Sequence, residues 1–457
     1  MHRRSWVLAA VVALGAPLIA CSDQPTAPSA VSASRHGPPP DLATAALVRG
    51  LAHERGIVRL RGAPYVRPAL VKLGEALAFD RILSGNRDLA CTTCHLPAYE
   101  TGDGRSVSIG SGGIGFGPAR THPDGTLIPR NAPPLFNLAG LRHLFWDGRV
   151  QMGRHHRVDT PAGAQITPAM QRVFEFGALS AQPMFPVLSP FEMRGHAGNE
   201  LAALPDSDAT AIWAGIMRRL GQIPEYRRMF EAAYPGTKFD DMTFAHASNA
   251  IAGFLVSRLT FANTPWDRFL DGDDDALTPR QLEGARTFLA LKCSICHTGA
   301  TLSDDQFHDV AVAQIGPGEG NGPSLRDDYG RMNVTGDPAD RYRFRTSPLR
   351  NVELTGPWGH DGAYATLRGF VEHYSESDQA LRSYDPMQLA PDVRGTLLDN
   401  SADILAQRDT LLDGVVLTPD VVDKLMDYMS ALTDPAARDL SRLVPSRVPS
   451  GLPVDRP

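Results

Sequence analysis

Two short segments of the chain carry cysteine and histidine in the same order and at the same spacing. Residues 91–95 read Cys-Thr-Thr-Cys-His, and residues 293–297 read Cys-Ser-Ile-Cys-His. In such a segment the two thiols can each add to one vinyl group of a porphyrin, and the histidine that follows supplies an axial ligand to the iron. The sequence therefore predicts two covalently bound haem c groups, attached through Cys91, Cys94 and His95 and through Cys293, Cys296 and His297.

A zinc site or a redox dithiol is the alternative interpretation of each segment. A zinc site built on one cysteine pair needs a second ligand pair, and the only other pair in this chain carries its own histidine at the same offset. Four of the five cysteines fall in the two segments. The repetition favours haem.

The N-terminus has the composition of an export signal. Arg3 and Arg4 precede an apolar run at 6–20, which is short for a membrane span. The run ends Leu-Ile-Ala-Cys, as in a bacterial lipoprotein cleavage site. We expect residues 1–20 to be removed and Cys21 to carry a lipid, with ordinary secretion as the alternative. Together with covalent haem, this predicts a periplasmic protein that meets the membrane only through its lipid anchor.

The remaining composition is that of a globular protein. The chain has 457 residues, of which 42% are hydrophobic and 21% charged, enough for two to three domains with real cores. The net charge of −6 gives no basis for a nucleic-acid partner. Residues 21–65 are expected to form a tether, rich in Ser, Ala and Pro, and an N-terminal segment.

Apolar periodicity predicts a mostly α fold with no sustained strand alternation. One expected helix leads into each cysteine motif, at 68–80 and from Thr278-Pro279 onward. We further expect helices at 41–55, 208–220, 224–234, 243–260, 366–374 and 419–432. The two motifs divide the chain into haem domains at 66–270, with an insertion near 150–181, and at 271–435. Residues 436–457 are expected to be a loose tail.

Four further motifs suggest a family. They are Arg-Asn-Ala-Pro at 130–133, Phe-Trp-Asp-Gly-Arg at 145–149, Glu-Met at 192–193 and Leu-Arg-Asn at 349–351. With the two cysteine motifs, they make the chain resemble the bacterial di-haem cytochrome c peroxidase and MauG family over roughly residues 66–432. The resemblance implies two cytochrome c-like haem domains packed against each other, and an oxidoreductase that acts on hydrogen peroxide.

The resemblance also implies roles in the first haem pocket. His95 would be the proximal ligand, Glu192 the group that moves a proton between the peroxide oxygens, and Gln182 its neighbour. A solvated surface carboxylate is the alternative for Glu192. Peroxidases of this family carry a capping histidine where this chain has Ser111, so we expect a five-coordinate first haem, unless His122 supplies that ligand.

For the second haem, the resemblance places the distal ligand at Tyr374. Peroxidases of the family have methionine there, whereas MauG-like members have tyrosine, an anionic ligand that favours oxidised iron. Two alternatives stay open: that His373 is the ligand, or that Tyr374 is a buried tyrosine without an iron bond.

The region between the haems carries the remaining implied residues. Trp146 would relay oxidising equivalents between the haems, besides being a core aromatic. Asn131, with the backbone carbonyls of Thr355 and Pro357, would bind a calcium ion. In the insertion, His155, His156 and Arg157 either meet a partner or lie in a solvated loop.

Three functions remain open at this stage. A peroxidase would take electrons from a small redox protein, either a cytochrome c or a cupredoxin. A MauG-like oxidase would modify a tryptophan or tyrosine of a partner protein. A di-haem electron carrier would have no catalytic role. Members of the family are often dimers, so a homodimer is one option.

Overall fold

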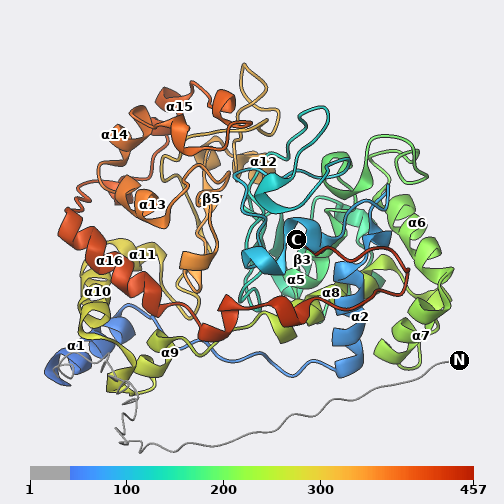
Figure 1. The fold of residues 1–457 in the computed structure, drawn as a ribbon, viewed down its shortest axis with the longest axis horizontal. Helices are drawn as coiled ribbons and strands as arrows, with labels where there is room; N and C mark the ends of the chain where they lie inside the picture. The colour runs from blue at the N-terminus through green and yellow to red at the C-terminus, as the bar shows by residue number, and fades with distance from the viewer. Residues whose placement is uncertain (1–41, 457) are drawn as a thin grey trace, which may run out of the picture. The chain divides into compact units, whose positions relative to one another are not determined.

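The computed structural model describes residues 42–456 and is mostly helical, as predicted (Figure 1). The helices are α1 (Leu42–Glu54), α2 (Pro68–Phe79), α3 (Cys91–Cys94), α4 (Pro168–Gln171), α5 (Ala178–Ala181), α6 (Ala209–Gly221), α7 (Pro224–Ala233), α8 (Phe244–Arg258), α9 (Pro265–Leu270), α10 (Pro279–Ala290), α11 (Cys293–Cys296), α12 (Met332–Thr335), α13 (Leu367–His373), α14 (Ser377–Arg382), α15 (Ser401–Leu405) and α16 (Pro419–Ala431). Each helix expected from the sequence is present within one or two residues of its predicted ends.

Several helices begin at a Thr-Pro pair. Threonine precedes the first helical residue of α4, α9, α10 and α16, and its hydroxyl accepts a hydrogen bond from the backbone N–H three residues later. The proline that follows has no N–H to leave unpaired and has a backbone angle suited to the first turn. These starts are therefore determined by local sequence.

Two pairs of crossing helices form the scaffold around the cysteine motifs. α2 packs on α8, and α10 packs on α16. At each crossing a glycine lets the backbones approach closely. A Cβ at Gly74 would overlap the carbonyl oxygen of Ala250, and a Cβ at Gly284 would overlap that of Lys424. The two halves of the chain thus use the same contact to place the short helix that carries each motif.

Each half has its own hydrophobic core. The first core includes the buried faces of α2, α5, α6, α7 and α8. The second includes those of α9, α10, α13 and α16, and it also takes in Ala45, Val48 and Ala52 from α1. The N-terminal helix α1 therefore packs on the C-terminal haem domain, where Arg49 also forms an ion pair with Asp274 at 2.5 Å.

The expectation of a loose C-terminal tail is wrong. Ala437, Leu440 and Val448 are buried in the first core, so the chain returns from α16 to the N-terminal half (red in Figure 1). The carboxylate of Asp455 is buried and pairs with Arg81 and Thr93. A few apolar side chains, spaced without helical period, were enough to anchor this segment because a preformed core was available to receive them.

Strands are few and short. Within and before the predicted insertion, β1 (His143–Leu144), β2 (Val150–Met152) and β3 (Val158–Asp159) form an antiparallel sheet, with His143 opposite Gln151 and Met152 opposite Val158. A second antiparallel pair joins β4 (Phe307–His308) to β5 (Phe344–Arg345).

The predicted insertion is only partly a surface loop. Val150, Val158, Ile166 and Met170 are buried in the first core, whereas 155–157 at the tip are exposed. The sheet and α4 thus attach the insertion to the domain and leave its basic tip in solvent. Among residues 42–456, no helix combines the length and apolar character needed to cross a membrane.

Candidate functional site

The first cysteine motif opens onto an apolar cavity. Cys91, Cys94 and His95 line it, together with apolar side chains from α2, α8 and the neighbouring loops, among them Phe79, Leu89, Phe145, Phe254 and Leu255. The Nδ1 atom of His95 lies 2.9 Å from the carbonyl oxygen of Thr101. Because a carbonyl only accepts, Nδ1 carries the proton and Nε2 keeps a lone pair for a metal.

The second motif repeats this arrangement. Cys293, Cys296 and His297 line a second cavity, with apolar side chains that include Phe288, Leu349, Trp358, Phe370 and Leu425. The Nδ1 atom of His297 lies 3.1 Å from the carbonyl oxygen of Leu302. Both carbonyls belong to residues with positive φ, +70° at Thr101 and +57° at Leu302. The same local turn therefore orients each histidine.

Both cavities fit a covalently held haem better than a zinc ion. Burial raises the pKa of Cys91 and of Cys293 to about 11, so these thiols are protonated when no group is bound. Among the described residues, the one group of three potential metal-binding side chains is Cys296, Asp304 and His308, and it contains neither cysteine of the first motif. An apolar cavity with two thiols and one imidazole Nε2 at its wall matches a flat hydrophobic ring with one axial ligand.

Glu192 and Gln182 both line the first cavity. Glu192 belongs to a π-helical turn, Pro190–Arg194, and its backbone N–H donates to Ser189 Oγ at 3.1 Å. Desolvation raises the pKa of its carboxyl above the usual value, and the positive charge of Arg149 opposes this shift. A partly desolvated carboxyl that lines a cavity can accept a proton from a bound molecule and return it.

Neither Ser111, which stands at the position of the capping histidine, nor His122, the alternative cap, is among the residues that line this cavity. The hydroxyl of Ser111 accepts from Asn86 at 3.0 Å and donates to Asp88 at 3.2 Å. His122 Nδ1 accepts from the backbone N–H of Asp124 at 3.1 Å. Glu192 and Gln182 therefore line this cavity, whereas Ser111 and His122 do not.

In the second cavity, Tyr374 and His373 differ in direction. Tyr374 lines the cavity, whereas His373 does not. His373 is buried, with Nδ1 at 2.6 Å from the hydroxyl of Tyr364 and Nε2 at 2.7 Å from the carbonyl oxygen of Val310. Both of its ring nitrogens are therefore engaged away from the cavity. Met429 of α16 also lines the cavity, and sequence reasoning did not single it out.

Trp146 and Asn131 line both cavities and so lie between them. The indole N–H of Trp146 donates to the carbonyl oxygen of Asn131 at 2.9 Å. The side-chain amide of Asn131 donates to the carbonyls of Arg105 and Ser106, which leaves its amide oxygen as the ligand it could offer. Thr355 and Pro357 line the second cavity, as Asn131 does.

A buried charge cluster, which sequence reasoning missed, joins the two halves. Arg130 binds Asp147 at 2.6 Å and Asp328, from the C-terminal half, at 2.6 and 2.9 Å. Arg149 also binds Asp147 at 3.0 Å. All these side chains except Arg149 are almost fully buried. Breaking a buried pair of this kind leaves an uncompensated charge, so the cluster holds the halves in register.

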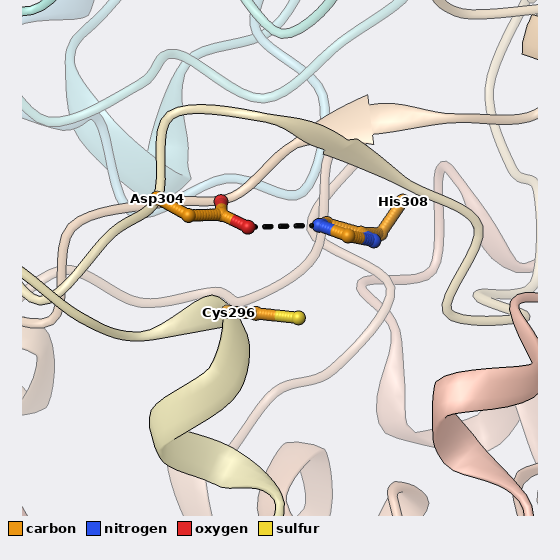
Figure 2. Close-up of side chains that lie close together, drawn as sticks. All are labelled: Cys296, Asp304 and His308. Atoms are coloured by element: carbon orange, nitrogen blue, oxygen red, sulfur yellow. Dashed lines mark hydrogen bonds and ion pairs between the residues drawn. The ribbon is translucent and has the colours of Figure 1, made fainter. Parts of the chain in front are cut away.

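A second charged group lies beside Cys296 (Figure 2). His308 is held between two carboxylates, with Nε2 at 3.0 Å from Asp304 and Nδ1 at 2.7 Å from Asp409. The hydrogen bonds to Asp304 and Asp409 raise the pKa of His308 above its usual value. Cys296 Sγ is the atom that the motif assigns to a thioether, so we interpret His308 as a fixed positive charge and not as a metal ligand.

Comparison with known proteins agrees with this geometry. Residues 68–275 match the family described as di-haem cytochrome c peroxidase. The cytochrome c peroxidase Ccp of Escherichia coli K12 is 31% identical over 304 residues, which cover 66% of this chain and 52% of that protein. This chain therefore spans about half the length of that relative.

Two further proteins extend the comparison. The methylamine utilization protein MauG of Methylorubrum extorquens is 28% identical over 308 residues, 67% of this chain and 69% of that protein. A crystal structure of a MauG-like protein associated with microbial copper homeostasis superposes with a TM-score of 0.59 at 25% identity, covering 84% of this chain and 96% of that one. With two cysteine motifs facing two matching cavities, the chain belongs to the di-haem cytochrome c peroxidase and MauG family.

Proposed function

We propose that this protein is a di-haem oxidoreductase that consumes hydrogen peroxide at the first haem. The observation that carries the proposal is the pairing, in one apolar cavity, of a histidine with a free Nε2 and a desolvated carboxyl, Glu192, beside the amide of Gln182. Haem held by Cys91, Cys94 and His95 would supply the redox chemistry.

The side chains of the first cavity then handle protons. Glu192 accepts the proton of the incoming peroxide and returns it to the departing oxygen, so that two electrons and two protons convert hydrogen peroxide into two molecules of water. Gln182 positions the peroxide through its amide. The apolar walls exclude bulk water and so keep the proton between peroxide and carboxyl. With Ser111 tied to Asn86 and Asp88, we infer that the distal side is open without prior reduction.

There are two alternative candidates for the electron donor. A small cytochrome c or cupredoxin is the donor expected of a peroxidase. A tryptophan or tyrosine of a partner protein is the donor expected of a MauG-like oxidase, and Tyr374 in the second cavity favours this second candidate. In either case Trp146, which borders both cavities, is the proposed relay for oxidising equivalents.

A Glu192→Gln variant tests the central role. Haem content should be unchanged, while the reaction of the ferric protein with peroxide should slow by about 100-fold or more. The matched control is Glu225→Gln, which alters a surface carboxyl paired with Arg447 and should react normally. Normal peroxide kinetics in Glu192→Gln would remove this residue from the mechanism.

Spectroscopy of the same ferric protein tests the ligands and the substrate class. An iron–phenolate vibration in resonance Raman would support Tyr374 as a ligand, and its absence would defeat that assignment. Loss of the ferric signal at both haems on peroxide addition, without a donor, supports the MauG-like candidate. Slow bleaching, with two low-spin haems throughout, would point to a simple electron carrier.

Calcium and cellular location belong to the same proposal. A calcium ion held by Asn131, Thr355 and Pro357 would rigidify the region between the cavities, and chelation should then change the spectrum of one or both haems. Periplasmic location through a lipid on Cys21 rests on residues 1–41, which lie outside the described part of the chain. Labelling with a radioactive fatty acid, lost in Cys21→Ser, tests it.

A further inference from the structure

A glycine-rich loop from the C-terminal half reaches the first cavity. Every second residue of this loop is glycine with positive φ, between +69° and +84°: Gly316, Gly318, Gly320 and Gly322. A Cβ at Gly318 would overlap the carbonyl oxygen of Arg326. Glycine adopts positive φ with the least strain, so the alternating glycines permit this path.

Backbone hydrogen bonds hold the loop in that course. The N–H groups of Glu319 and Asn321 donate to the carbonyl oxygen of Asp327 at 3.1 and 3.2 Å, and the N–H of Asp327 donates back to Asn321 at 3.0 Å. These hydrogen bonds fix the backbone at Glu319, which lines the first cavity together with Glu192. One third of its side-chain surface, 33%, is still open to solvent. Glu319 is therefore a carboxyl that lines the cavity without being fully buried.

The surrounding charges leave Glu319 loosely held. Arg130 lies 3.5 Å from its carboxyl but is already bound by Asp147 and Asp328 at 2.6 Å. Arg149 is the other positive charge that acts on both Glu319 and Glu192. A carboxyl beside two carboxylates and a shared guanidinium is not locked in its anionic form, so it can exchange protons.

We propose that Glu319 is a second acid–base residue of the first cavity, contributed by the opposite domain, through which Glu192 exchanges protons with solvent. The inference rests on the proposed function for its role in turnover. Desolvation raises the pKa of Glu319, and its negative charge raises that of Glu192, which agrees with two carboxyls sharing one cavity. The alternating glycines permit the backbone path on which the C-terminal half brings Glu319 to this cavity.

The first experiment measures the pH dependence of cyanide binding to the ferric haem, which does not require turnover. Hydrogen cyanide binds as the anion, so a base in the cavity must take its proton, and the rate rises with pH through the pKa of Glu192. Glu319→Gln removes a negative neighbour and should move this midpoint to lower pH by roughly 0.5 unit or more. Glu319→Asp keeps the charge and should retain most of the wild-type midpoint, as should the control Glu225→Gln.

The second experiment measures peroxide turnover with a one-electron organic dye as donor. Glu319→Gln should turn over about 10-fold more slowly than wild type, and added formate should restore the rate by carrying protons in place of the missing carboxyl. A merely structural loss would not respond to formate. An unchanged cyanide midpoint, or slow turnover that formate does not rescue, would overturn the proposal. If wild type fails to reduce peroxide while the midpoint still moves, the proposed function fails and the pairing of the two carboxyls stands.

Discussion

The two cavities share a scaffold and differ in what faces the cysteine motif. Both have a glycine-mediated helix crossing and a histidine whose Nδ1 is held by a backbone carbonyl. Across the first cavity lie the polar side chains of Gln182 and Glu192. Across the second lie aromatic ones, Tyr374, Trp358 and Phe370. The shared scaffold places each cysteine motif at the wall of a cavity, and in the proposed function the different linings account for proton chemistry at the first haem and storage of charge at the second.

The largest difference between the two cavities should appear when one cysteine pair is removed at a time. We expect Cys91→Ala/Cys94→Ala and Cys293→Ala/Cys296→Ala each to carry one covalent haem in place of two, because each pair forms its own thioethers. Intact-mass spectrometry of the purified proteins measures this.

The same two variants should also divide the chemistry. The variant without Cys91 and Cys94 should lose the rapid reaction with peroxide. The variant without Cys293 and Cys296 should keep that reaction but show no oxidation of the second haem. Two haem adducts in either variant would contradict the assignment of that motif.

Arg130→Met should have the next largest effect, on the free energy of unfolding, because it removes the positive charge that links Asp147 of the N-terminal half to Asp328 of the C-terminal half. Asp147 and Asp328 would be left buried without their partner, at a cost of about 3–5 kcal/mol. Urea denaturation followed by circular dichroism measures the free energy of unfolding. Arg67→Met is the control, since its pair with Glu175 is partly exposed and should contribute at most ~1 kcal/mol.

The pH dependence of the free energy of unfolding gives a second test of the role of Arg130. Desolvation alone would raise the pKa of Asp147, but the charges of Arg130 and Arg149 outweigh it and hold that pKa well below its usual range. A carboxyl with a depressed pKa stabilises the fold above its unfolded-state pKa of about 3.9 and loses that contribution as the pH falls below it. Wild type should therefore lose stability below about pH 4, and Arg130→Met should lose less over that range. Equal losses would contradict this role.

The smallest effect should come from the two helix crossings. Gly74→Ala and Gly284→Ala each force a methyl group against a backbone carbonyl and should cost about 1–3 kcal/mol, by similar amounts in the two domains. Gly50→Ala in α1 is the control. No atom lies within 4 Å of the added Cβ, so the substitution should stabilise by up to ~1 kcal/mol. A large cost at only one crossing would show that the two scaffolds are not equivalent.

Local patterns predicted the elements well. The Cys-x-x-Cys-His spacing and the Thr-Pro helix starts act within a few residues, so they operate in the same way wherever the chain places them. Family resemblance added Glu192, Gln182 and Trp146, which the structure brings to the walls of the cavities. The tail was misjudged because Ala437, Leu440 and Val448 show no helical period, and only a distant core explains their burial.

By itself, the sequence determined the cofactor type, the number of haem domains and the helices that lead to each motif. Only the tertiary structure decided that α1 packs on the C-terminal domain, that Arg130 joins the halves, and that Glu319 enters a cavity built by the other domain. Covalent attachment and helix capping depend on neighbours in sequence. Ion pairs and shared cavities depend on side chains more than a hundred residues apart, whose meeting is set by the packing of whole domains.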